Sequence, residues 1–430
     1  MRYDPIDSEL FVRNREKLCG MLKPNSIVVV HANDILPTNA DGTFLLQQNR
    51  DLFYLSGIDQ EETVLVLFPE AKNEKDREIL FVRETNETIA IWEGAKLEKE
   101  QATEVSGIKR IQWTTSFEGV LSYLAPQAEN IYLTTNEHLR AMRVVETRND
   151  RFIKDCQARF PLHQYQRLAP LMGELRMIKD QVEIDMLQKA CDITDAGFRR
   201  VLGFLKPGVG EWEVEAEYLH EFVRNRSRGF AYSPIIGTGK NACVLHYLEN
   251  KDICQDGDML LMDVAAEYAN WNADMTRTIP VNGKFTPRQR AVYEAVLSVF
   301  RQANEILRPG MILKDYQQQV REFTEVELIK LGLIDAEEAK KQDREKLPLV
   351  DKYFMHGTSH HLGLDVHDVG SSHEPVREGM VFTIEPGIYI LEENIGVRLE
   401  NDFLIGKDGN IDLMANIPIE PDEIEALMNA

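Results

Sequence analysis

Asp258–Pro280, which reads DMLLMDVAAEYANWNADMTRTIP, is the stretch that decides the fold of the second half of the chain. The apolar run before Asp263 predicts a buried strand, and the segment from Asp274 onward predicts its antiparallel partner. A turn at Tyr268–Ala269 would place Asp263 directly opposite Asp274, where paired side chains come within about 5 Å. Two carboxylates this close repel each other unless a proton or a cation lies between them. The segment therefore predicts a β-hairpin whose two carboxylates share a proton or a cation, and the alternative is a hairpin with two solvated aspartates.

Histidines gather in a second segment, residues 355–373, which reads MHGTSHHLGLDVHDVGSSH. It holds five of the ten histidines of the chain. Glycines flank them, and the histidines do not follow a helical pattern. This composition favours a site supported by loops. Either His360 or His361 could supply a metal-binding nitrogen, and their spacing alone does not choose between them.

Two glutamates follow in strand-like runs. Glu385 lies in MVFTIEPGIY (380–389), directly before Pro-Gly, and a carboxylate at that strand end is costly to bury without a partner. Glu400 lies in IGVRLENDF (395–403), where alternation places it on the same strand face as Arg398. Each glutamate alone is equally well explained as a surface residue. With the aspartates and a histidine, they predict an oxygen-rich site without sulfur, and its four carboxylates call for two hard or borderline divalent ions.

The rest of the chain predicts two domains, 1–172 and 173–430, because 430 residues exceed one ordinary core. In the first domain, short apolar runs alternate with helical patterns such as the long amphipathic stretch Glu137–Phe160, which predicts an α/β unit. In the second domain, LKPG at 205–208 and LRPG at 307–310 each follow a helical stretch, 102 residues apart. This faint repeat predicts a domain of two similar halves around one sheet.

Composition excludes several classes of function. The formal charge of −22 repels phosphate backbones, so we expect no nucleic-acid partner. The polar first residues and the lack of long apolar runs predict no signal peptide, no membrane segment and a cytoplasmic location. The five cysteines are scattered and form no C-x-x-C pair, so we expect reduced thiols and no thiolate metal site.

The ordered set of motifs resembles the metal-dependent aminopeptidases with the pita-bread fold, and most closely the aminopeptidase P (Xaa-Pro aminopeptidase) family. These motifs are the aspartate hairpin, HGTSHHLGLDVHD, TIEPGIY and VRLEND. QNRDLFYLSG at 48–57 and IWEG at 91–94 resemble that family's N-terminal domain, so the resemblance covers almost the whole chain. It implies an α/β N-terminal domain, an α+β pita-bread catalytic domain with pseudo-two-fold halves, and removal of the first residue from peptides with proline in second position.

The resemblance also implies a role for each site residue. Asp274 and Glu400 would bridge two divalent ions, with Mn²⁺ as the first choice and Co²⁺, Zn²⁺ or Fe²⁺ as alternatives. A bridging hydroxide would be the nucleophile, Glu385 would pass its proton to the leaving nitrogen, and His246 or His367 would stabilise the oxyanion. The implied metal ligands are Asp263, Asp274, His360, Glu385 and Glu400. The implied substrate-binding residues are Tyr232, His356, Tyr389 and Arg398.

Two alternative functions compete with this interpretation. Prolidase, the dipeptidase of the same fold, shares the ligands, but the short interval of 15 residues between Glu385 and Glu400 favours the aminopeptidase. A non-catalytic binding protein on this fold would generally lose ligands, and all five are present.

The resemblance treats His361 as a packing residue. It further implies a homodimer or homotetramer, in which Trp92 matches a residue that reaches a neighbouring site.

Overall fold

The computed structural model describes residues 2–138, 140–142, 144–343, 346, 348–371 and 373–430. The chain forms two compact units, Tyr3–Arg176 and Met177–Ala430. The change from one unit to the other lies inside helix α7 (Ala169–Met177), four residues beyond the expected boundary at 172. Within the described residues, none of the helices is long and apolar enough to cross a bilayer.

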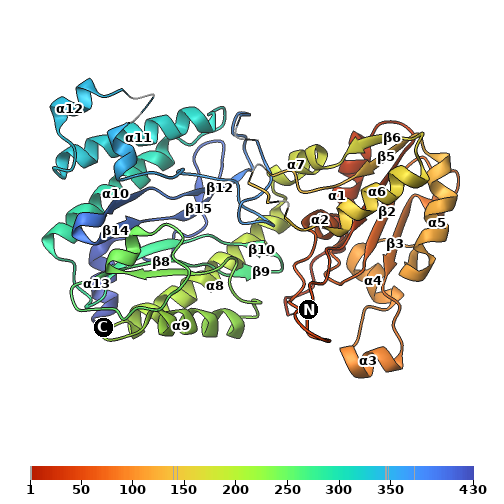
Figure 1. Ribbon diagram of the computed structural model, residues 1–430, viewed down its shortest axis with the longest axis horizontal. Coiled ribbons are helices and arrows are strands. Elements are labelled where there is room, and N and C mark those ends of the chain that lie inside the picture. Colours follow the sequence, from red (N-terminus) through yellow and green to blue (C-terminus); the bar gives the residue numbers. More distant parts are fainter. Residues whose placement is uncertain (1, 139, 143, 344–345, 347, 372) are drawn as a thin grey trace. The chain divides into compact units, whose positions relative to one another are not determined.

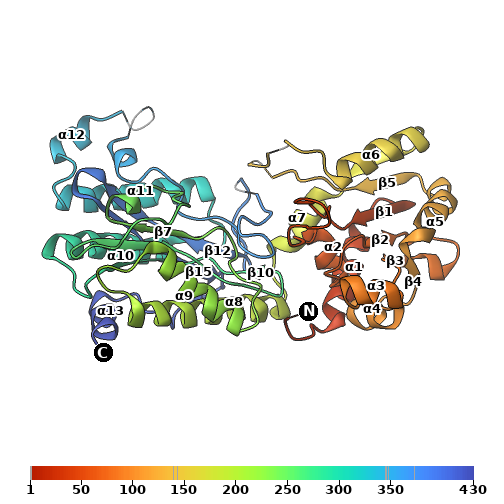
Figure 2. The ribbon, with the colours of Figure 1, turned by 60° about the horizontal axis from the view of Figure 1, so that its bottom comes forward.

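The N-terminal unit is built on a six-stranded mixed sheet in the order β4-β3-β2-β1-β5-β6 (Figure 1). The central strand β1 (Ser26–His31) is antiparallel to β2 and parallel to β5. Its side chains alternate, so that Ile27 and Val29 pack with helices α5 and α6, while α1 and α2 lie on the other side of the sheet (Figure 2). The other elements of the unit are α1 Ser8–Met21, α2 Arg50–Ser56, β2 Val64–Leu67, β3 Glu78–Val82, α3 Glu87–Glu93, α4 Lys99–Ser106, β4 Ile111–Trp113, α5 Phe117–Leu124, β5 Asn130–Leu133, α6 Arg148–Arg159 and β6 Gln164–Arg167.

One predicted helix of this unit is much shorter than its amphipathic pattern indicates. Residues 139 and 143 of the stretch Glu137–Phe160 lie outside the described residues, and among the others only those of α6, beginning at Arg148, are helical. The reason is a capping box: Thr147 accepts from the backbone of Asp150, and the Asp150 carboxylate accepts from the backbone of Thr147. These contacts satisfy the free N–H groups at Thr147 and Asp150, so the helix starts there despite the apolar residues before it.

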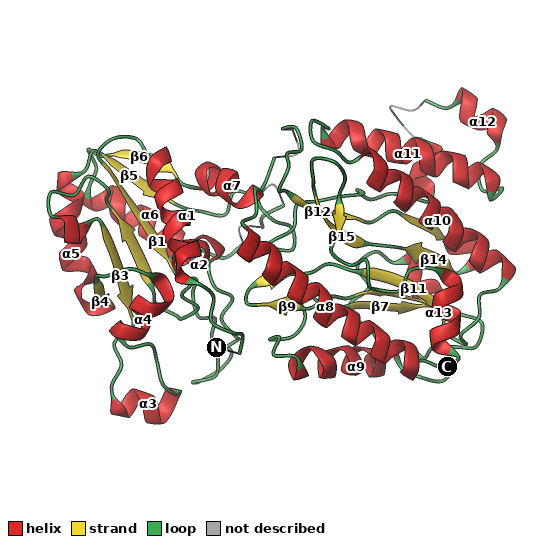
Figure 3. Ribbon diagram, turned by 180° about the vertical axis from the view of Figure 1, so that it is seen from behind, coloured by secondary structure: helices red, strands yellow, loops and turns green. Residues whose placement is uncertain are grey.

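The C-terminal unit shows the predicted repeat of a helix, a Pro-Gly stop and a second helix. After α8 (Gln181–Phe204), Gly208 has a φ of 94° and its N–H donates to Cys254 O at 2.8 Å. After α10 (Pro287–Ile306), Gly310 has a φ of 93° and donates to Val376 O at 2.8 Å. Left-handed φ values favour glycine at both stops. Figure 3 shows the pair α8 and α9 on one side of the strands and the pair α10 and α11 on the other.

The strands between the two helix pairs form short antiparallel sheets. One sheet has the order β11-β8-β7, a second has the order β12-β15-β16, and β13 pairs with β14. The predicted pita-bread fold with two similar halves is confirmed, as is the α/β fold of the N-terminal unit. The remaining elements are α9 Glu211–Arg224, β7 Ile235–Thr238, β8 Met259–Asp263, β9 Glu267–Tyr268, β10 Trp271–Asn272, β11 Thr276–Pro280, α11 Leu313–Lys330, α12 Ala336–Lys341, β12 Val381–Ile384, β13 Gly387–Ile390, β14 Ile395–Arg398, β15 Asn401–Leu404, β16 Ile411–Asp412 and α13 Pro421–Met428.

The predicted register of the aspartate hairpin is wrong by two residues. Thr276, and not Asp274, lies opposite Asp263. The chain turns at Ala269 and Asn270, whose φ values of 52° and 73° are those of a tight hairpin turn with both central residues left-handed. Because a shift of two residues keeps every side chain on its original face, both aspartates still point to the same side of the sheet.

Gly396 on β14 lets this strand approach the chain around Ala242. A Cβ atom at Gly396 would lie 2.1 Å from Ala242 O, which is a backbone atom and cannot rotate away. We therefore expect Gly396→Ala to lower the free energy of unfolding by about 1–3 kcal/mol through forced backbone shifts. The measurement is urea-induced unfolding followed by circular dichroism.

Gly203→Ala is the matched control for this substitution. Gly203 lies in α8 and a Cβ atom there would meet nothing within 4 Å. Alanine is a better helix former than glycine by about 0.5–1 kcal/mol, so Gly203→Ala should raise the free energy of unfolding. Equal effects of the two substitutions would show that the close approach at Gly396 does not constrain β14.

Candidate metal centre and active site

The two aspartates of the hairpin are held by different groups. Asp263 ends β8, where its Oδ2 accepts a hydrogen bond from Arg398 Nη2 at 2.6 Å. Its Oδ1 is buried and has no hydrogen-bond partner within the described residues. Asp274 lies just before β11, and Asp402 Oδ2 accepts from its backbone N–H at 3.0 Å. The hairpin thus presents one carboxylate oxygen that burial leaves unsatisfied, which calls for a ligand.

His360 and Glu385 are brought together because the histidine-rich segment runs beside β12. The N–H of Thr383 donates to His360 O at 3.1 Å, and the N–H of Glu385 donates to Thr358 O at 2.8 Å. These backbone contacts place His360 Nε2 3.8 Å from Glu385 Oε1 and 3.4 Å from Asp274 Oδ2. His360 and Glu385 therefore reach the aspartate hairpin from a segment about a hundred residues further along the chain.

Glu400 joins the site through an isolated bridge between its backbone and that of Thr276. The Thr276 hydroxyl donates to Glu400 Oε2 at 2.7 Å and accepts from Arg398 Nε at 3.1 Å. Arg398 and Glu400 therefore project to the same side, as the alternation predicts. Ligand atoms of Asp274, His360 and Glu400 all lie within 4.8 Å of one another.

Burial and mutual repulsion make the carboxyl groups of this site hard to ionise together. Burial raises the pKa of Glu385 to about 7, although His360 and Arg398 oppose the shift. Burial, with the charge of Asp274 next, raises the pKa of Glu400 well above its ordinary value. Burial also raises the pKa of Asp263. A divalent cation among them would favour the ionised forms, because an opposite charge nearby lowers the pKa of a carboxyl group.

His360 is oriented as a metal ligand would be. Its Nδ1 lies 3.0 Å from His361 O, and since a carbonyl oxygen only accepts, Nδ1 must carry the proton. Its Nε2 then faces Asp274 and Glu385. Burial disfavours a charged ring, but Asp274 raises the pKa of His360 to about 9, so in this arrangement a proton occupies the place that a cation would take. The donor set of four carboxylates and one imidazole fits hard or borderline divalent ions.

The other predicted site residues surround this cluster. The His367 ring stacks on His360 with centroids 4.2 Å apart. The Tyr232 hydroxyl accepts from the N–H of Met275 at 3.5 Å, and burial, with the charge of Asp263 next, raises its pKa. His356 Nε2 lies 2.8 Å from the hydroxyl of Tyr389, which also accepts from Arg398 Nη1 at 2.7 Å. His246 is exposed on the segment after β7, and its charge is the smallest of the named causes that shift the pKa of His356. His361 points elsewhere: it is buried, and its ring packs on Phe382 with centroids 4.3 Å apart.

Two residues that hold the predicted ligands were not predicted from the sequence. Thr276 links Glu400 to Arg398, and Asp402 fixes the backbone of Asp274 and accepts from Cys191 Sγ at 3.5 Å. Asp402 lies two residues after Glu400 in VRLEND, and Thr276 lies two residues after Asp274. Because side chains two apart on a strand share a face, this spacing was the signal that could have found both.

Two family models match the chain, one on each unit. Residues 185–407 match metallopeptidase family M24, and residues 11–132 match the N-terminal domain of aminopeptidase P. The Xaa-Pro aminopeptidase of Escherichia coli K12 is 33% identical over 99% of this chain and 98% of its own length. The chain belongs to the aminopeptidase P family of M24 metallopeptidases. It is a hydrolase, an M24 metallopeptidase of the Xaa-Pro aminopeptidase type, as the motifs imply.

More distant relatives and solved structures agree with this family. Human Xaa-Pro aminopeptidase 3 is 28% identical over 95% of this chain and 82% of its own length. The structure of zinc-substituted E. coli aminopeptidase P in complex with product has a TM-score of 0.88 and 32% identity, covering 99% of both chains. The structure of the same enzyme with the inhibitor Pro-Leu has the same TM-score, identity and coverage.

Proposed function

We propose that this protein removes the N-terminal residue from peptides with proline in second position, using two divalent metal ions. The observation that carries the proposal is the cluster of Asp274, His360 and Glu400, whose ligand atoms lie within 4.8 Å of one another. Asp263 and Glu385 adjoin this cluster, and they complete the proposed set of ligands. The resemblance to the family implies that Asp274 and Glu400 would be the residues shared by both ions. Divalent ions held there would activate a water molecule and polarise the peptide carbonyl.

Glu385 is the proposed proton carrier of the reaction. It lies at the end of β12, between His360 and His356, whose Nδ1 is 3.7 Å from Glu385 Oε2. A carboxylate in this position can accept the proton of the attacking water and donate it to the leaving proline nitrogen. His367, stacked on His360, and His246, which is exposed like His367, are the proposed donors to the developing oxyanion.

The proposed substrate wall is a hydrogen-bonded row formed by Arg398, Tyr389 and His356. The Tyr389 hydroxyl lies 2.7 Å from Arg398 and 2.8 Å from His356, so each side chain fixes the next. Burial, with the charge of Arg398 next, lowers the pKa of His356 to about 3, so this ring is neutral. Tyr232, whose pKa is raised by burial and by the charge of Asp263, is the fourth proposed substrate-binding residue. An imino-acid nitrogen in a peptide has no N–H, so this wall would select proline by the shape of its ring.

Removal of metal tests the proposal. Protein treated with a chelator and then desalted should lose cleavage of an Xaa-Pro-Yaa peptide by at least about 100-fold, because the nucleophile depends on the ions. Mn²⁺ is expected to restore it, with Co²⁺, Zn²⁺ and Fe²⁺ as comparisons. Unchanged cleavage after verified loss of all bound metal would end the two-metal proposal.

Prolidase activity stays the alternative, because a dipeptidase could use the same five ligands. The short connection between β13 and β14, residues 391–394, favours the aminopeptidase, since it adds no segment that would close the site behind a dipeptide.

Assembly into a homodimer or homotetramer also stays a prediction. Trp92 on α3 is 84% exposed, which supports a partner surface there.

A further inference from the structure

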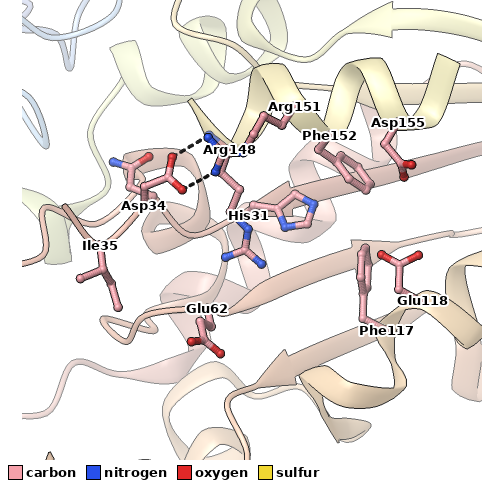
Figure 4. Close-up of a pocket in the computed structure, with 11 residues that line it drawn as sticks. His31, Asp34, Ile35, Glu62, Phe117, Glu118, Arg148, Arg151, Phe152 and Asp155 are labelled. Carbon is pink, nitrogen blue, oxygen red and sulfur yellow. Dashed lines mark hydrogen bonds and ion pairs between the residues drawn. The ribbon is translucent and has the colours of Figure 1, made fainter. Parts of the chain in front are cut away.

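The N-terminal unit contains a cavity of about 510 Å³ between the end of β1 and helices α5 and α6 (Figure 4). This volume lies within the range of about 300–1,000 Å³ typical of small-molecule sites. All residues of the proposed metal centre belong to the other unit, so the proposed peptidase mechanism does not use this cavity. Apolar rings form one wall: Phe117 and Phe152 flank His31, with centroids 5.4 Å and 4.2 Å from its ring.

His31 faces the cavity without a hydrogen bond. It is 3% exposed, and neither ring nitrogen has a partner among the residues described. Burial, with the charge of Arg148 next, lowers the pKa of His31 to about 3, so the ring is neutral and carries one N–H donor and one acceptor. Buried polar atoms are nearly always paired, so two orphaned nitrogens on a cavity wall indicate a missing partner.

The Arg148 guanidinium lies below His31 in Figure 4, and its side chain forms no hydrogen bond or ion pair with the described part of the chain. Only its backbone N–H is used, in a bond to Asp34 Oδ2 at 2.7 Å. Burial lowers the pKa of Arg148, although the nearby charges of Glu62 and Asp34 oppose the shift, so its charge is poorly solvated. A half-buried guanidinium of this kind favours an anion, and its planar fork matches a carboxylate.

The acids around the cavity already have cationic partners. Asp34 accepts from Arg151 at 2.5 Å, and both Glu118 and Asp155 pair with Arg159 at 2.6 Å and 2.8 Å. Glu62 lies 3.9 Å from Arg83. None of these carboxylates forms an ion pair with the Arg148 side chain among the described residues, although Glu62 and Asp34 lie close enough to raise its pKa. Their charges would repel a doubly charged phosphate more strongly than a single carboxylate. Among the described residues that line the cavity, the groups without a hydrogen bond or ion pair thus include one cation, one neutral imidazole and two phenyl rings.

We propose that this cavity binds a small monocarboxylate with an aromatic or aliphatic body. Arg148 binds the carboxylate in a bidentate manner, and His31 donates to one of its oxygens or accepts from a neighbouring N–H of the ligand. Phe117 and Phe152 contact the apolar body. The site would give the N-terminal domain a ligand of its own, separate from peptide cleavage.

The test uses 3-(4-fluorophenyl)propionate as the probe and the full-length, metal-loaded protein. Fluorine NMR titration should show saturable binding, and the uncharged 3-(4-fluorophenyl)propan-1-ol should bind much more weakly. Arg148→Gln should raise the dissociation constant of the acid by about tenfold or more, as expected for a lost charge-assisted pair. Lys154→Gln is the matched control, because it removes one positive charge from the same helix at a side chain that does not line the cavity.

Binding that Arg148→Gln leaves unchanged would overturn the proposal, because the carboxylate would then lie elsewhere, for example at the metal centre. Hydrogen–deuterium exchange of the unmodified protein gives an independent result that does not depend on how a variant folds. The acid should protect backbone amides in residues 31–35 and 148–152. Protection confined to the C-terminal unit would contradict the site.

Discussion

Glu385→Gln is expected to lower kcat for Xaa-Pro peptides by about 10²–10⁴-fold, the usual contribution of a positioned acid–base group. The amide keeps the size of the side chain but can neither take up the proton of the attacking water nor donate it to the leaving nitrogen. Burial disfavours the ionised form of Glu385, so a neutral amide should not destabilise the metal-free fold. Steady-state kinetics, together with the thermal unfolding midpoint of the metal-free variant, measure the two effects separately.

Glu392→Gln is the matched control for Glu385→Gln. Glu392 lies on the exposed turn between β13 and β14 and pairs with Lys352 at 3.0 Å, away from the carboxylate cluster. Exposed ion pairs contribute about 0–1 kcal/mol, so this variant should retain full activity and stability. If Glu385→Gln kept activity within a few-fold of the unmodified enzyme while still binding metal, another group would have to carry the proton.

His360→Ala is expected to weaken metal binding by at least about 100-fold. Loss of a partner that merely supports a ligand already costs about 10–100-fold in affinity or activity, and loss of the ligand itself should cost more. His360 is also the one nitrogen donor in the proposed set, and its Nε2 faces both Asp274 and Glu385. Metal titration followed by elemental analysis of the desalted protein gives the affinity and the number of bound ions.

His361→Phe separates the two neighbouring histidines. Burial lowers the pKa of His361 to about 4, and its neutral ring packs on Phe382, so phenylalanine replaces one buried aromatic ring by another. This variant should bind metal as the unmodified protein does. If His361→Phe lost metal and His360→Ala did not, the assignment of the imidazole ligand would be wrong.

The strand ends that carry the carboxylates could be predicted from the sequence, because an acidic residue at the end of a buried apolar strand needs a binding partner. Glu385 follows four apolar or β-branched residues, and Asp263 follows Met-Leu-Leu-Met. The register between Asp263 and its partner strand could not be predicted, because residues 264–275 offer several turn positions. The chain uses Ala269 and Asn270, and an alanine with positive φ is not a turn signal that residue type reveals.

Contacts between distant segments were also beyond sequence reasoning. The pairing of Arg398 with Asp263 joins residues 135 positions apart, and only the folded sheet shows that one guanidinium spans Asp263, Thr276 and Tyr389. The helix predicted from the long amphipathic stretch Glu137–Phe160 is shorter than expected for a local reason. The capping box at Thr147 determines where α6 begins, and this short-range signal outweighs the longer periodicity.

Product analysis by mass spectrometry tests the central claim most directly. The Mn²⁺-loaded enzyme would be given Ala-Pro-Leu, its matched peptide Ala-Ala-Leu and the dipeptide Ala-Pro in separate reactions. Ala-Pro-Leu is expected to yield free alanine and Pro-Leu, Ala-Ala-Leu to stay largely intact, and Ala-Pro to be cleaved more slowly than the tripeptide. Cleavage of Ala-Pro in preference to Ala-Pro-Leu would indicate a prolidase, and equal cleavage of Ala-Ala-Leu would contradict selection of proline.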